Sequence, residues 1–150
     1  MEKNIFEINE ITCVVYANKN PEYLLIQPVN EPHAQMLDQQ IRFMTEHTEK
    51  SFLLAAFLVK DWNQDLSPWC APAVFGKESF GEGAGETLAF IEKKLIPEIA
   101  RRYKLEEGIK DIQVILGGYS LAGLFALWST YQENCTSKFA AAAGISPSVW

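Results

Sequence analysis

The chain has 150 residues, of which 48% are hydrophobic and 21% are charged, and this length and composition predict one globular domain over residues 1–150. Its 19 acidic and 13 basic residues give a formal net charge of -6, and the basic residues form no cluster. Nucleic acid and anionic membranes are therefore disfavoured as partners, and an aromatic content of 12% argues against disorder.

Apolar runs and turn signals predict strands that alternate with helices. Residues 11–16 and 23–29 are β-prone runs, and they are separated by a turn signal at residues 18–21. Asn30 and Pro32 predict the start of a helix, because Asn caps helices and Pro suits their first turn. The apolar residues that follow recur at helical spacing and are Leu37, Ile41 and Met44.

The middle of the chain combines a buried strand with a long loop. Residues 52–59 are apolar throughout, which is typical of a strand covered on both faces. A loop is expected from residue 60 to about residue 85, ordered by the packing of its aromatic side chains Trp62, Trp69, Phe75 and Phe80. A helical stripe begins at Leu88, and Pro97 predicts a kink or a break within it.

The last third predicts a strand at residues 112–116, a helix at 121–131 and a strand at 139–145. Residues 140–143 are alanines, which favour a helix by propensity, but their place in the alternation favours a strand. The whole order, β-β-α-β-α-β-α-β, predicts an α/β fold with a mainly parallel sheet and helices on both faces. Functional groups of such sheets gather beyond the carboxyl ends of the strands.

Cysteine usage and hydropathy predict a cytoplasmic protein without a metal site built on its cysteines. Cys13, Cys70 and Cys135 lie far apart and form no metal-binding spacing, so we expect reduced thiols. The N-terminus has no signal-peptide run, and the longest apolar run, residues 52–59, is too short to cross a bilayer.

The sharpest signal is Gly118-Tyr119-Ser120-Leu121-Ala122, which lies between a predicted strand and a predicted helix. The small-x-Ser-x-small spacing is typical of a nucleophile elbow, a strained turn that projects a serine hydroxyl beyond the sheet. Gly118 and Ala122 are small because larger side chains would collide where strand and helix pass closely. Ser120 is therefore the candidate nucleophile, and the Leu121 amide is a candidate oxyanion donor. An ordinary glycine-rich turn is the alternative.

Three segments resemble the α/β-hydrolase superfamily, in particular the esterases that include esterase D and the enterochelin-esterase-like enzymes. They are residues 118–127 (GYSLAGLFAL), 145–150 (ISPSVW) and, more weakly, 61–69 (DWNQDLSPW). The resemblance implies an α/β-hydrolase-like fold and hydrolysis of a small-molecule carboxylic ester through an acyl-enzyme on Ser120. It implies neither a cofactor nor a metal.

The family places its acid and its histidine downstream of the nucleophile. This chain has only His33 and His47, both upstream, and Glu133 is the only acidic residue after Ser120. We therefore expect an N-terminal portion of a longer hydrolase that lacks the last strands and helices. His33 is either a solvated first-turn residue or a substitute base, whereas His47 is expected to be structural.

Further site candidates follow from the expected sheet edge. Asp61 and Asp65 are expected to cap or decorate a turn, with orientation of a base or contact with substrate as the alternative. The resemblance implies a second oxyanion donor after residues 23–29, which is Asn30 or Glu31 because Pro32 has no amide hydrogen. The candidates for a substrate pocket are Trp62, Trp69 and Tyr119, and packing against the domain is the alternative for the two tryptophans.

Two functions remain in competition at this point. One is a serine hydrolase of the esterase type, and the other is a non-catalytic, hydrolase-like protein that acts as an oligomeric binding module. Loss of the last strands would expose the strand at residues 139–145 as a sheet edge, so we expect a homodimer or larger assembly with Trp150 near the contact.

Overall fold

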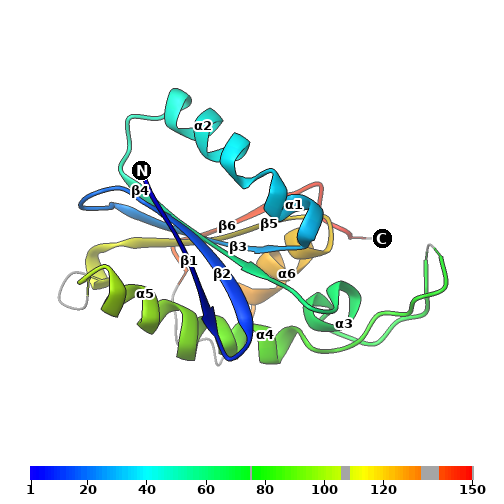
Figure 1. The fold of residues 1–150 in the computed structure, drawn as a ribbon. Helices are drawn as coiled ribbons and strands as arrows, with labels where there is room; N and C mark the ends of the chain where they lie inside the picture. Colours follow the sequence, from blue (N-terminus) through cyan, green and yellow to red (C-terminus); the bar gives the residue numbers. More distant parts are fainter. Residues whose placement is uncertain (75, 106–108, 133–138, 150) are drawn as a thin grey trace.

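The computed structural model describes residues 1–74, 76–105, 109–132 and 139–149. A six-stranded sheet of order β1-β2-β4-β3-β5-β6 forms the centre of this part of the chain (Figure 1). Its strands are β1 (Glu2–Ile8), β2 (Ile11–Ala17), β3 (Tyr23–Val29), β4 (Phe52–Leu58), β5 (Gln113–Tyr119) and β6 (Ala141–Ile145). The pairs β3–β4, β3–β5 and β5–β6 are parallel, whereas β1–β2 and β2–β4 are antiparallel. The predicted mainly parallel sheet is therefore confirmed.

Helices cover both faces of the sheet, as predicted. Helices α1 (Glu31–Gln35) and α2 (Leu37–His47) lie on one face, and α4 (Ala84–Phe90), α5 (Ile96–Arg102) and α6 (Leu121–Ser129) lie on the other (Figure 1). Successive residues of β4 alternate between two hydrophobic cores, because Leu54 packs beneath α2 while Leu53 packs against the helices opposite. This double cover explains why β4 is apolar at every position.

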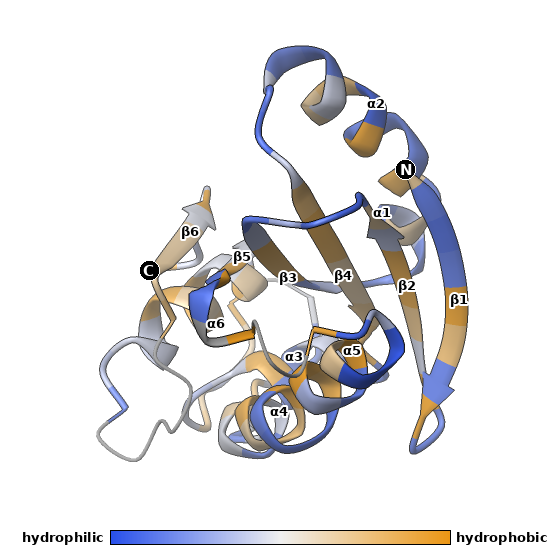
Figure 2. Ribbon diagram, turned by 90° about the vertical axis from the view of Figure 1, so that its left-hand side faces the viewer, coloured by the Kyte–Doolittle hydropathy of each residue, from blue (hydrophilic) through white to orange (hydrophobic). Residues whose placement is uncertain are grey.

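Figure 2 shows hydrophobic residues along β4, at the middle of the sheet, and hydrophilic residues over much of β1, at one edge. The sequence prediction missed β1, because its side chains alternate between exposed and half-buried positions and include charged ones. The strand forms by pairing with β2 across a tight turn in which Asn9 and Glu10 have positive φ angles of 49° and 62°.

The helix after β3 and the loop after β4 also differ from the prediction. The predicted single helix is divided at Met36 into α1 and α2. The expected long loop contains a short helix, α3 (Trp62–Leu66). Trp62 and Phe80 pack against the core as expected, but Trp69 is 55% exposed, so its predicted packing is wrong. Phe75 lies outside the described residues.

The helical segment before Pro97 changes from α-helical to π-helical hydrogen bonding, in the region where a kink or a break was expected. A π-helical turn (Ile91–Leu95) connects α4 to α5, and Pro97 is the second residue of α5. Proline lacks the amide hydrogen that an interior α-helical turn needs, so the change of hydrogen bonding just before it has a direct cause.

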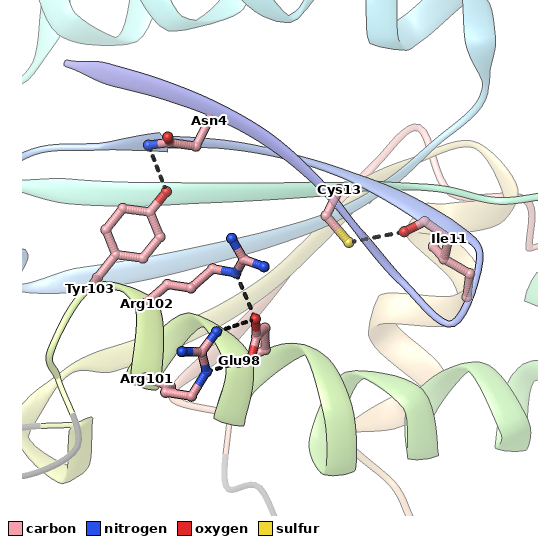
Figure 3. Close-up of polar contacts among 7 residues, drawn as sticks. All are labelled: Asn4, Ile11, Cys13, Glu98, Arg101, Arg102 and Tyr103. Carbon is pink, nitrogen blue, oxygen red and sulfur yellow. Dashed lines mark hydrogen bonds and ion pairs between the residues drawn. The ribbon is translucent and has the colours of Figure 1, made fainter.

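Side chains at the end of α5 contact residues of β1, at the edge of the sheet (Figure 3). The guanidinium of Arg102 lies over the ring of Phe6, 3.9 Å from its centroid, and Asn4 Nδ2 donates to the Tyr103 hydroxyl over 3.2 Å. These contacts from α5 and Tyr103 give the edge strand a tertiary partner besides β2.

Glu98, on α5, accepts hydrogen bonds from Arg101 Nη2 at 2.8 Å and from Arg102 Nε at 2.6 Å (Figure 3). The Arg101 and Arg102 side chains together lower the pKa of Glu98 from 4.5 to about 2. The carboxyl group therefore stays ionised in the folded chain far into the acid range.

Within the described residues, no helix is both long and apolar enough to pass through a membrane. The same residues contain no group of three or more His, Cys, Asp or Glu side chains arranged to hold a metal ion. Cys13 is a buried free thiol and Cys70 an exposed one, while Cys135 lies outside the described part of the chain.

Candidate active site

Ser120 occupies a strained turn between β5 and α6. Its backbone angles are φ 57° and ψ -121°, a conformation that residues with side chains rarely adopt. The strand ends at Tyr119 and the helix begins at Leu121, so the whole change of direction falls on this one residue. A serine at such a junction projects its hydroxyl away from both elements, as a nucleophile elbow requires.

Gly118 allows the strand and the helix to approach each other at this turn. A Cβ atom added to Gly118 would lie 2.5 Å from both the carbonyl carbon and the Cβ of Ala122. Gly123 is restricted in the same way, since an added Cβ would lie 3.0 Å from the Gly118 oxygen and 3.2 Å from Pro147. The small residues predicted from the spacing are therefore required by real contacts.

The segment that follows β6 closes the turn from the other side. The Ser120 amide donates to the Ile145 carbonyl over 3.0 Å, and the Ser148 amide donates to the Ser120 carbonyl over 3.2 Å. The two hydroxyl oxygens, Ser120 Oγ and Ser148 Oγ, are 3.1 Å apart and hydrogen-bonded. Ser148 is only 7% exposed while Ser120 is half-buried, so this contact is partly sheltered from water. The sequence analysis did not single out Ser148, because nothing local links it to a residue 28 positions earlier.

The candidate oxyanion donors lie at the starts of two helices. Leu121 is the first residue of α6, and the first amides of a helix have no carbonyl partner inside it. Asn30 precedes α1, where its side chain accepts a hydrogen bond from the His33 amide over 3.0 Å. This capping contact uses the side chain of Asn30 and not the backbone amide on which the oxyanion prediction depends.

A group of aromatic side chains includes Tyr119, the residue before Ser120. The ring of His33 lies edge-on to Tyr119, with centroids 5.5 Å apart, and edge-on to Trp62, with centroids 6.0 Å apart. His33 is half-buried, so its ring is partly covered by these contacts. The fold thus joins two of the three pocket candidates to the candidate substitute base. Among the described residues, no ring contact connects Trp69 to this group.

The remaining candidates have structural partners. Asp61 caps α3 by accepting from the Gln64 amide over 3.0 Å, and Asp65 accepts from the Asp61 amide over 3.1 Å. His47 stacks on Phe43, with ring centroids 4.1 Å apart, and its Nδ1 lies 2.7 Å from the Phe43 carbonyl oxygen. The capping role expected for the two aspartates and the structural role expected for His47 both match these contacts. Glu133 lies outside the described residues.

Comparison of sequences finds no matching family model and no matching curated protein. Comparison of structures finds clear matches. The siderophore hydrolase EstA from Aspergillus nidulans has a TM-score of 0.68 and 18% identity, over 99% of this chain and 57% of its own. The siderophore hydrolase EstB from the same organism has a TM-score of 0.62 and 19% identity, over 99% of this chain and 56% of its own.

The enterobactin and salmochelin hydrolase IroE matches with a TM-score of 0.61 and 18% identity, over 98% of this chain and 62% of its own. The chain thus spans little more than half the length of these structures. The chain therefore has the α/β-hydrolase fold, with siderophore hydrolases among its structural neighbours at low sequence identity.

Proposed function

We propose that this chain carries the nucleophile of a serine hydrolase of the carboxylic-ester type, and that Ser120 is that nucleophile. The observation that supports the proposal most directly is the backbone conformation of Ser120, which has a φ of 57°. This residue lies between a strand and a helix that approach each other closely at Gly118. Strain of this kind is retained in folded proteins mostly where a function needs it.

The reaction would follow the acyl-enzyme route. Ser120 Oγ forms a bond to the ester carbonyl carbon while its proton passes to a general base, and the carbonyl oxygen becomes an oxyanion. The Leu121 amide and the Asn30 amide would donate to that oxyanion. Collapse releases the alcohol with the base's proton, and water then attacks the acyl group and restores the serine.

The general base has two candidate sources. In the α/β-hydrolase fold the histidine and its acid follow the nucleophile in the chain, and no histidine follows Ser120 within the 150 residues. His33 is the alternative, supported by its contact with Tyr119, the residue before Ser120. A chain without an effective base retains only the contribution of binding and oxyanion stabilisation, because loss of a triad member lowers kcat about 10⁴-fold. We expect slow turnover of activated aryl esters at best.

The substrate would be a small-molecule ester. The pocket predicted from Trp62, Trp69 and Tyr119 is supported for Trp62 and Tyr119, which share contacts with His33. Siderophore hydrolases among the neighbours support an ester as the substrate class of the whole enzyme. The competing proposal of a non-catalytic binding module has no comparable observation in its favour, since the structural neighbours named above are hydrolases.

Covalent labelling tests the proposal. After it binds, a fluorophosphonate forms a single covalent bond to an activated serine with loss of fluoride and needs no deacylation, so it suits a chain without a complete triad. We expect one adduct, located at Ser120 by peptide mass spectrometry and absent from Ser120→Ala. Ser79→Ala, which removes an exposed loop serine, should label like the parent chain. Labelling elsewhere, or equal labelling of Ser120→Ala, would refute Ser120 as the nucleophile and favour the binding module.

A further inference from the structure

We propose that Ser148 is a positioning residue for Ser120: its buried hydroxyl holds the Ser120 hydroxyl in one orientation. This inference rests on the proposed function, because it assigns a role toward the same nucleophile. The two oxygens are 3.1 Å apart, and no other side-chain hydrogen bond of Ser148 is seen within the described residues.

The chain is folded so as to bring Ser148 to this point. Ser146 has a φ of 45°, so the backbone turns sharply at the end of β6. Pro147 then passes over α6 at Gly123, where even a Cβ would lie 3.2 Å from Pro147 Cα. The Ser148 amide donates to the Ser120 carbonyl, which fixes the distance between the two residues independently of their side chains. The turn at Ser146 and the close passage at Gly123 thus bring the Ser148 hydroxyl to the Ser120 hydroxyl.

The contact has a chemical consequence at each stage of attack. A serine side chain has three staggered orientations, and only one aims Oγ at a bound carbonyl carbon. At rest, one hydroxyl of the pair donates and the other accepts, which selects an orientation of Ser120. When the general base withdraws the proton of Ser120, the Ser148 hydroxyl can donate to the oxygen that gains electron density. Ser148 keeps its own proton and forms no covalent bond.

The readout that separates positioning from a structural role is the chemical step of fluorophosphonate labelling. The observed rate of labelling depends on the fluorophosphonate concentration. This dependence gives two quantities, a constant for reversible association and a first-order rate constant for bond formation. We expect Ser148→Ala to lower the rate of bond formation about tenfold, the factor that corresponds to one neutral hydrogen bond, with the association constant unchanged. Ser148→Thr, which retains a hydroxyl, should recover most of the rate.

Ser129→Ala is the matched control. Ser129 is also buried, and its hydroxyl donates to the Ala126 carbonyl over 2.8 Å within α6, away from Ser120 Oγ. This variant loses a comparable buried hydrogen bond and should lower the melting temperature but leave the labelling rate unchanged. Equal rates for Ser148→Ala and the parent chain would overturn the inference while leaving Ser120 as the nucleophile.

A second measurement tests the inference even if the fluorophosphonate does not label the parent chain. That absence of labelling would refute the proposed function, but the contact between the two hydroxyl groups could still be tested. Urea unfolding of Ser120→Ala, Ser148→Ala and the double variant forms a thermodynamic cycle. Each single variant leaves one hydroxyl of the pair, buried at Ser148 and half-buried at Ser120, without its partner, so the double variant should be less destabilised than the sum of the two. Additive effects would show that the hydroxyl groups do not interact, and the positioning role would be lost with them.

Discussion

Gly118 and Ala122 lie so close together that a Cβ on Gly118 would be 2.5 Å from the Cβ of Ala122. This distance is shorter than any ordinary contact between carbon atoms, for which the optimum is about 3.5–4.0 Å. One of the two elements would have to move to accept a methyl group, and the turn at Ser120 joins them directly. The contact therefore connects the identity of residue 118 to the conformation of residue 120.

Gly118→Ala should destabilise the fold by about 1–3 kcal/mol or more, the usual range for overpacking at a closely packed site. Urea unfolding followed by circular dichroism measures the change. Gly85→Ala is the control, because Gly85 lies in α4 and a Cβ there meets nothing within 4 Å. That substitution should leave stability unchanged or raise it by up to about 1 kcal/mol through helix propensity. Equal effects of the two substitutions would contradict the proposed packing.

Asn30→Ala should lower the free energy of unfolding by about 1 kcal/mol, because it removes the side-chain cap on the His33 amide. Asn30→Asp retains an acceptor oxygen and should restore most of that loss. The backbone amide of residue 30 is present in all three chains. Fluorophosphonate labelling of folded protein should therefore persist in Asn30→Ala if this amide, and not the side chain, is the oxyanion donor.

Because of the low pKa of Glu98, the free energy of unfolding should depend on pH in the acid range. The pKa of this carboxyl group in the folded chain is about 2, below its ordinary value of 4.5, so ionisation favours the folded state. The contribution is complete above pH 4.5 and is lost as the pH falls toward 2. Glu98→Gln should therefore lower the melting temperature at pH 7, and the difference from the parent should shrink through that acid range. Glu78→Gln, at an exposed loop position, is the control. A difference that does not depend on pH would refute the ion-pair explanation.

The two described thiols should differ sharply in reactivity. Burial raises the pKa of the Cys13 thiol to about 11, whereas Cys70 is exposed on the loop after α3. Only the thiolate reacts with iodoacetamide, so at pH 8 we expect rapid modification of Cys70 and modification of Cys13 only in urea. Peptide mass spectrometry identifies the sites. Rapid modification of Cys13 in the native protein would show that the core between β2 and α5 opens readily.

Self-association through β6 remains a prediction. The strand is at one edge of the sheet, where within the described residues it pairs only with β5, and its last residue, Ile145, is 61% exposed. Light scattering should give a mass above the 16.9 kDa of one chain, and Ile145→Asp should reduce it. Ile5→Asp places the same charge on β1 at the opposite edge, where Ile5 is 63% exposed, and should have no effect. A monomeric parent would contradict the exposed-edge argument. Trp150, expected near the contact, lies outside the described residues.

The sequence predicted the features that depend on neighbouring residues. The turn at Ser120 was predictable because its requirements fall within five consecutive positions. The strand β4 was predictable because burial on both faces leaves only apolar residues in it. The final strand was harder, since residues 141–143 are alanines with little β propensity. Its place after a strand and a helix decided the prediction.

The missed features depend on distant partners. The strand β1 carries polar residues and is stabilised by β2 and by the end of α5, which its own sequence does not reveal. Ser148 belongs to a segment that resembles the esterases, but its role is not visible in the sequence, because its hydrogen bond to Ser120 exists only in the folded chain. Trp69 was expected to pack because it is aromatic, yet hydrophobic type alone does not determine burial in a loop.

The hydrogen bonds between the Ser120 turn and the segment after β6 also set an order of events during synthesis. Ribosomes add about 5–20 residues per second, so roughly 1–6 s separate the addition of Ser120 from that of Ser148, which is 28 positions later. The β1–β2 hairpin and α2 can form in that time, and the Ser120 carbonyl can already accept from the Gly123 and Leu124 amides of α6. The Ser120 amide and the Ser120 hydroxyl, however, have no partner until Ile145 and Ser148 emerge. Ser120, the proposed nucleophile, therefore reaches its final environment only after the first strands and helices of the fold have been made.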